Sequence, residues 1–112
     1  MQTAKLRMYM LALTLTLAVH IDVGAVPMFG VISCGDWVKN VREKNLSEDL
    51  QSIWLNGYLS GAASASGDDV LKGASTASLL LWVTNYCNIN PLENSSAAGN
   101  ELFLELKKKM KK

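Results

Sequence analysis

The chain has 112 residues, of which 49% are apolar and 19% are charged, and its formal net charge is +1 at pH 7. A chain of this length forms one domain at most. The near-neutral charge excludes a nucleic-acid-binding protein that acts through bulk positive charge. The high apolar content excludes intrinsic disorder of the whole chain. We therefore expect one folded domain without a nucleic-acid partner.

The first 25 residues have the three parts of a secretory signal peptide. Lys5 and Arg7 form a basic start, an apolar stretch at 8–19 follows it, and compact side chains lead to a cleavage site at Ala25. A transmembrane anchor is the alternative, but a helix that spans a bilayer needs about 20 apolar residues. We therefore expect this segment to be a signal peptide and the domain 26–112 to be exported without an integral membrane span.

The charges of the mature chain are unevenly distributed. Removal of 25 of the 112 residues leaves 87, and the only histidine, His20, leaves with the leader. Residues 26–106 carry nine acidic and four basic side chains, whereas residues 107–112 carry five lysines. Cations are favoured at a helix C-terminus. We interpret the lysine-rich tail as a solvated helix end, with contact to acidic lipid headgroups as the alternative.

Two cysteines, Cys34 and Cys87, lie 53 positions apart in the mature part. An even number of cysteines in an exported chain predicts a disulfide. A metal pair and a reactive thiol are the alternatives. Structural zinc requires four ligands, and a catalytic cysteine requires a base that the mature chain lacks. We therefore expect one disulfide, which the loop-entropy model values at about 4 kcal/mol.

Apolar residues at spacings of three and four, together with capping residues, predict four helices, and no segment alternates like a strand. We place the helices at about residues 34–44, 48–65, 76–88 and 96–109, with Ser33, Ser47, Ser75 and Ser95 as their N-caps. A single helical turn is expected at 70–73. The predicted fold class is all-α, a small bundle of about four helices in which the disulfide ties the first helix to the end of the third.

The apolar faces of these helices predict the core. Trp37, Trp54 and Trp82 lie on such faces, so we expect them in the core rather than stacked on a ligand. The buried stripe of the third helix consists of Leu79, Trp82, Val83, Tyr86 and Cys87.

The second helix carries two glycines on a face with large apolar residues. Leu50, Trp54, Gly57, Tyr58 and Gly61 recur there at spacings of three and four. Each glycine costs about 1 kcal/mol in a helix relative to alanine. Close approach of another backbone compensates for such a cost. The simpler interpretation is a second helix of the same chain, and the alternative is a second copy in a homodimer.

Few residues of the mature chain suit catalysis or metal binding. The absence of histidine removes the usual general base near neutral pH and the commonest metal ligand. Glu48 and Asp49 start a helix, where acidic residues are favoured, and Asp68 and Asp69 lie in a turn sequence. No pattern of calcium ligands or glycine-rich phosphate loop is present. We therefore expect no enzyme, no metal and no cofactor.

Three segments together resemble a known family. They read SCGDW at 33–37, WLNGYLSG at 54–61 and LWVTNYC at 81–87, the last followed by NPL at 90–92. In this order they are similar to the small exported proteins grouped with the Tai/Rap immunity proteins of type VI secretion, over about residues 33–106. The resemblance implies a periplasmic, helical, disulfide-bonded and often dimeric protein. Characterised relatives bind and block a peptidoglycan amidase toxin.

The leading hypothesis is a non-enzymatic periplasmic protein of the immunity type that occludes a cell-wall amidase. An exposed loop would enter the partner's cleft, and we expect Ser66–Ser75 to be this loop, with Asp68 and Asp69 as partner-binding residues. The alternative is a chaperone similar to the HdeA-type acid-stress proteins. Without a mature histidine, its acid trigger would have to be the nine carboxylates of the body.

Overall fold

The computed structural model describes residues 28–112, so the predicted leader and its cleavage site lie outside the described residues. Within 28–112, four helices account for 72% of the residues and no strand is present. They are α2 (Cys34–Glu43), α3 (Leu46–Ser66), α4 (Thr76–Ile89) and α5 (Ser95–Met110). This confirms the predicted all-α fold. Over the same residues, no helix combines the length and apolar character needed to cross a bilayer.

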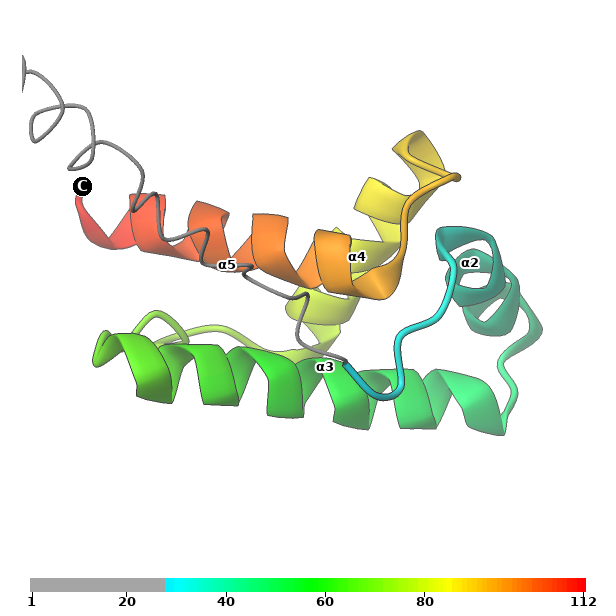
Figure 1. Ribbon diagram of the computed structural model, residues 1–112, viewed down its shortest axis with the longest axis horizontal. Coiled ribbons are helices and arrows are strands. Elements are labelled where there is room, and N and C mark those ends of the chain that lie inside the picture. The colour runs from blue at the N-terminus through cyan, green and yellow to red at the C-terminus, as the bar shows by residue number, and fades with distance from the viewer. Residues whose placement is uncertain (1–27) are drawn as a thin grey trace, which may run out of the picture.

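The helices pack around α4, which contacts each of the other three. In Figure 1, α3 and α5 run along the long direction of the view, α4 crosses behind them, and α2 lies at one end. One buried cluster joins all four helices; it consists of Cys34, Trp37, Leu55, Leu59, Leu79, Val83, Cys87, Ala98 and Leu102. The small core therefore depends on contributions from every helix.

The disulfide lies inside this cluster. Cys34 and Cys87 are bonded, their Cα atoms are 4.7 Å apart, and both side chains are fully buried. The prediction of a link between the first helix and the end of the third is thus confirmed. Because the bridge spans 53 positions, it holds α2 against α4 across most of the domain.

A second connection joins the chain before α2 to the start of α5. Ser33 and Asn94 form an isolated antiparallel bridge. The Cys34 amide donates to the Glu93 carbonyl at 2.9 Å, and the Ser95 amide donates to the Ile32 carbonyl at 2.9 Å. Ser33 of this bridge directly precedes Cys34 of the disulfide in the sequence. The bridge and the disulfide therefore stabilise the same end of the bundle.

Two of the four predicted N-caps are correct and two are wrong. Ser33 and Ser75 cap α2 and α4 as predicted. Asn45, not Ser47, caps α3, because its side chain accepts from the Ser47 amide at 3.0 Å. Asn94 rather than the predicted Ser95 caps α5, because the Ser95 hydroxyl is turned inward and accepts from another segment.

The three tryptophans differ in burial. Trp37 is fully buried, and its indole N–H donates to Thr84 Oγ1 at 3.0 Å. Trp54 and Trp82 are only partly buried at the edge of the core. Each of them stacks on the tyrosine one turn later, Trp54 on Tyr58 and Trp82 on Tyr86. The core expectation therefore holds fully for Trp37 and in part for the other two.

The sequence prediction for the face of α3 is right only in part, since Trp54 and Tyr58 pack against the edge of the core. The residues of α3 that enter the core are Gln51, Leu55 and Leu59, and Leu50 is exposed. Both series repeat at helical spacing, so periodicity alone does not choose between them. Gly57 and Gly61 are exposed, and a Cβ atom at either would meet nothing within 4 Å. The interpretation that they allow close approach of a helix of the same chain is thus wrong.

Candidate protein-binding site

The loop between α3 and α4 is fixed at its start and in its middle. Gly67 ends α3 in the left-handed region at φ 72°, and its amide donates to the Ala63 carbonyl at 3.0 Å. Val70 is buried and anchors the middle of the loop. Residues 70–73, predicted as one helical turn, form non-helical turns closed by hydrogen bonds such as that from the Ala74 amide to the Leu71 carbonyl, at 3.0 Å.

The two aspartates of this loop have different surroundings. Asp68 Oδ2 lies 3.4 Å from Lys107 Nζ on α5, and the two side chains are 44% and 36% exposed. Lys107 Nζ also lies 5.6 Å from the centre of the Phe103 ring. A half-exposed ion pair of this kind contributes about 0–1 kcal/mol. Asp69 is exposed, so of the two predicted partner-binding residues Asp69 presents the more accessible carboxylate.

A groove lies between this loop, α4 and α5, and we call it the loop groove. Its volume is about 730 Å³. Buried Val70, Leu79 and Leu102 contribute to its apolar lining, together with partly buried Trp82. Its charged lining residues are Asp69, Lys72 and Lys109. The groove combines an apolar surface with charges of both signs, as a protein-binding site commonly does.

Sequence reasoning identified the loop but missed most of the groove. Trp82 was assigned to the core, whereas it also lines the groove. Lys109 was assigned to a solvated tail, whereas it lies in the last turn of α5 beside the loop groove. The apolar periodicity of α4 includes Trp82 and so indicates that this residue faces other elements. No local pattern predicts that the end of α5 lies near residue 69.

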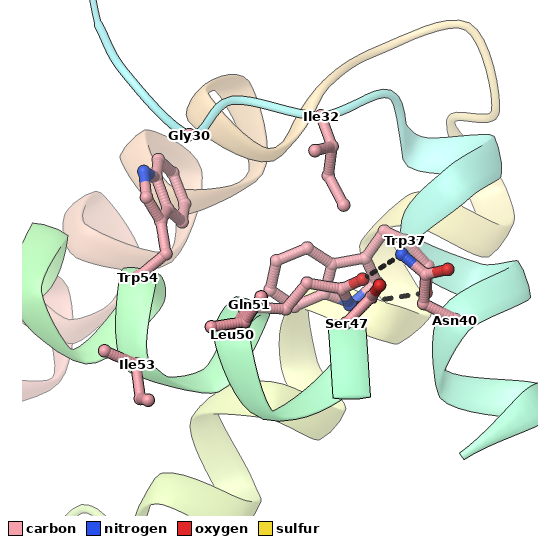
Figure 2. Close-up of a pocket in the computed structure, with 9 residues that line it drawn as sticks. All are labelled: Gly30, Ile32, Trp37, Asn40, Ser47, Leu50, Gln51, Ile53 and Trp54. Carbon is pink, nitrogen blue, oxygen red and sulfur yellow. Dashed lines mark hydrogen bonds between the residues drawn. The ribbon is translucent and has the colours of Figure 1, made fainter. Parts of the chain in front are cut away.

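A second concave region lies at the other end of α3 and is shown in Figure 2; we call it the tryptophan hollow. Its volume is about 500 Å³. It is formed by segment 30–32, α2 and the first half of α3, and its lining residues are Gly30, Ile32, Trp37, Asn40, Ser47, Leu50, Gln51, Ile53 and Trp54.

Polar atoms of the tryptophan hollow are paired within the chain. The buried Gln51 side chain accepts from Asn40 Nδ2 at 2.6 Å and donates to the Trp37 carbonyl at 3.4 Å. Trp54 Nε1 donates to the Phe29 carbonyl at 2.8 Å. Within 28–112, no buried side-chain nitrogen or oxygen lacks a hydrogen-bond partner. What the hollow offers a ligand is therefore mainly apolar surface.

Segment 28–33 approaches α3 closely at Gly30. Gly30 has φ 77°, and a Cβ atom there would lie 2.6 Å from Trp54 Cδ1. Only glycine fits this combination of positive φ and contact. The chain before α2 is thus held against α3 and forms one wall of the tryptophan hollow.

The described residues contain no group of three or more His, Cys, Asp or Glu side chains that could hold a metal ion. Among residues 28–112, one titratable group has a clearly shifted pKa. Burial raises the pKa of Tyr86 above its ordinary value of 10.0, and the negative charges of Glu93 and Glu101 raise it further. Tyr86 therefore stays a neutral phenol at physiological pH.

No family model, curated protein or solved structure matches this chain.

Proposed function

We propose that this chain is a non-enzymatic, periplasmic binding protein of the immunity type that occludes a cell-wall amidase. The resemblance of segments 33–37, 54–61 and 81–87 to the Tai/Rap proteins of type VI secretion supports this class of partner. The disulfide Cys34–Cys87 is consistent with an oxidising compartment such as the periplasm. A signal peptide at residues 1–25 would deliver the chain there.

The observation that carries this proposal is the pairing of a fixed loop with an open groove. The loop is anchored by Val70 and tied to α5 through the pair Asp68–Lys107. A fixed loop enters a partner's cleft with little loss of conformational entropy, which favours affinity. The loop groove beside it extends the contact surface with Trp82, a residue type enriched among the strongest interface contacts.

Occlusion requires no chemistry from this chain. In the proposed complex, Asp69 accepts hydrogen bonds from basic or polar groups in the amidase cleft, and the body of α4 and α5 covers the surface around it. Stable complexes bury about 800 Å² on each partner. A loop alone is too small for such an interface, so the loop groove is expected to be part of it.

The test compares two pairs of acidic residues, and the two residues of each pair are neighbours in the sequence. The double variant Asp68→Ala/Asp69→Ala removes two negative charges from the loop, and Glu48→Ala/Asp49→Ala removes two from the start of α3. The tagged mature chain is crosslinked in periplasm, and captured proteins are identified by mass spectrometry. We expect capture of an amidase by the wild type and by the α3 variant, and at least tenfold less by the loop variant.

Equal capture by both variants would remove the loop from the proposal. Recovery of no wall hydrolase by the wild type would contradict the immunity function itself. Circular dichroism of each variant checks that helix content is unchanged.

A second candidate function is an acid-stress chaperone similar to the HdeA type. It is favoured by one specific observation, the exposed apolar side chains Leu50 and Ile53 that line the tryptophan hollow. A chaperone would bind many unrelated clients at acidic pH and would expose more apolar surface there. Dye fluorescence that stays constant as the pH falls would exclude this candidate.

A further inference from the structure

The apolar lining of the loop groove follows one stripe of α5. Leu102, Leu106 and Met110 recur at intervals of four along this helix, and all three line the groove. Side chains at this spacing share one face of a helix, and the stripe from 102 to 110 is about 12 Å long. Leu79 and Trp82 of α4 belong to the same lining. The groove therefore presents an elongated apolar surface to which two helices contribute.

Positive charge predominates in the lining of this groove. Lys72 of the loop and Lys109 of α5 both line it, and both are exposed. Asp69 is the acidic residue of the lining, whereas the charge of the neighbouring Asp68 is compensated by Lys107 Nζ at 3.4 Å. An anionic group at the groove would therefore be attracted by two lysines and repelled by one aspartate.

The groove offers few hydrogen bonds to a polypeptide. Ser78 lines it, but the Ser78 hydroxyl already donates to the Ser75 carbonyl at 2.9 Å and accepts from the Ser75 amide at 3.2 Å. Each residue of a peptide brings an amide N–H and a carbonyl, and burial of these groups without partners is costly. An alkyl chain brings no such groups. The lining therefore favours an alkyl chain over an extended peptide.

We propose that the loop groove binds a single-chain anionic amphiphile, of which a fatty acid carboxylate is the simplest. The alkyl chain lies along the apolar stripe of α5 and contacts Trp82, and the carboxylate is bound by Lys72 and Lys109. The groove volume of about 730 Å³ falls within the range of about 300–1,000 Å³ that is usual for ligand sites. Such sites combine a mainly apolar lining with a small number of polar groups.

The tryptophan hollow differs from the loop groove in its charge. None of the nine residues that line the hollow is charged (Figure 2). The hollow can therefore hold the apolar part of a ligand but has no cation for an anionic group. An anionic amphiphile is thus expected to favour the loop groove.

Binding of an amphiphile requires no amidase, so it is tested on the purified chain independently of the proposed function. A chain that binds no amphiphile would leave the amidase proposal standing. If both proposals hold, the amphiphile and the amidase compete, because the loop groove is also expected to contribute to the amidase interface.

The site is located by quenching of tryptophan fluorescence with a laurate that carries bromine at the end of its chain. We expect this ligand to quench the fluorescence of the mature chain, and we expect Trp82→Phe to lose most of the quenching. Trp54→Phe, which changes a tryptophan of the other cavity, is the matched control and should retain it. Loss of quenching in Trp54→Phe alone would place the ligand in the tryptophan hollow. That result, or a wild type that is not quenched, would overturn the proposal.

The contribution of charge is measured by calorimetric titration with laurate below its micelle-forming concentration. Lys72→Gln/Lys109→Gln should weaken binding about fivefold, whereas Asp69→Asn should strengthen it about twofold, because it removes a repulsive charge. Lys39→Gln/Lys44→Gln removes the same charge from exposed positions on and after α2 and should leave the affinity unchanged. Equal weakening by the two double variants would attribute binding to the overall charge and overturn the proposed site.

Chain length distinguishes binding in the groove from binding to a membrane surface. The affinity should rise about fourfold for each methylene group that the apolar stripe buries, so laurate should bind more tightly than decanoate. Vesicles that contain phosphatidylglycerol are the comparison. Binding of the chain to these vesicles without binding of free laurate would assign the lysines to a membrane surface and overturn the proposal.

Discussion

Ser95 Oγ accepts a hydrogen bond from the Ile32 amide at 3.1 Å, although the two residues are 63 positions apart. Ser95 is fully buried, and its own amide donates back to the Ile32 carbonyl. The start of the described chain and the start of α5 are therefore locked together by reciprocal bonds. This lock lies next to the disulfide and holds segment 28–33 against the bundle.

Ser95→Ala is expected to destabilise the protein by about 1–3 kcal/mol, because it leaves the part-buried Ile32 amide without its acceptor. The free energy of unfolding is measured by urea denaturation. Ser96→Ala changes the neighbouring serine, whose hydroxyl contacts only Met28 Sδ in an exposed position. It should change stability by less than about 0.5 kcal/mol. Equal effects of the two variants would show that the Ser95 hydroxyl does not stabilise this connection.

Loss of the disulfide is expected to cost about 4 kcal/mol, because the bridge closes a loop of more than 50 residues in the unfolded chain. Cys34→Ala/Cys87→Ala and the reduced wild type should both lose most of their resistance to urea. The double variant also serves as the control, since added reductant should leave its unfolding midpoint unchanged. A wild type whose midpoint does not move on reduction would contradict a stabilising role for the bridge.

Thr84→Val is expected to destabilise the protein by about 1–3 kcal/mol, because the fully buried Trp37 indole N–H loses its acceptor without a large change in volume. Thr76→Val is the matched control, since the Thr76 hydroxyl forms hydrogen bonds only with Asn56, and these are exposed. Its effect should be within about 0.5 kcal/mol. The two unfolding free energies are compared by denaturant titration with tryptophan fluorescence.

Tyr86 is expected to ionise later than an exposed tyrosine in alkaline titration. Its pKa is raised in the folded protein by burial and by the charges of Glu93 and Glu101. Below pH 10 Tyr86 is protonated in both the folded and the unfolded state, so its full contribution to the free energy of unfolding is present there. As the pH rises past 10 and through the folded pKa, the free energy of unfolding decreases, because the unfolded chain releases this proton more readily than the folded protein does.

The measurement is the ultraviolet absorbance of the phenolate as a function of pH. Glu101→Gln should move the Tyr86 transition toward lower pH, because it removes one of the negative charges that raise the pKa. Tyr86→Phe identifies which transition belongs to this residue. A Tyr86 transition at or below the ordinary value of 10.0 would contradict a raised pKa in the folded protein.

Local sequence patterns predicted α4 well, because the capping residues, the helix end and the apolar periodicity of this segment all indicate the same helix. Ser75 and Ser78 form a reciprocal capping box at its start, and Asn90 ends it before Pro91. Leu79 and Val83 follow the apolar stripe that enters the core. The disulfide was also predictable, because the chain has only two cysteines to pair.

Local patterns do not predict which face of α3 is buried, because both of its faces carry apolar or small residues. Leu50 and Leu55 lie on different faces, and only contact with α4 and α5 determines that Leu55 is buried. The cap of α3 was missed for a similar reason. Asparagine and serine cap helices about equally well, so the sequence does not distinguish Asn45 from Ser47.

The loop was predicted as a turn region, but its partners were not. The ion pair Asp68–Lys107 joins residues 39 positions apart, and its formation depends on how α5 packs beside the loop. The loop groove depends on the same packing. For this reason the sequence indicated an acidic loop, whereas in the structure Lys109 of α5 lines the same groove as Asp69.

We propose that this chain blocks a cell-wall amidase by occupying its cleft. The most direct measurement is the rate of peptidoglycan hydrolysis by the captured amidase, titrated with the purified mature chain. We expect that hydrolysis stops at one chain per enzyme cleft and that Asp68→Ala/Asp69→Ala requires at least tenfold more protein. Undiminished hydrolysis at a large excess of the wild-type chain would contradict it.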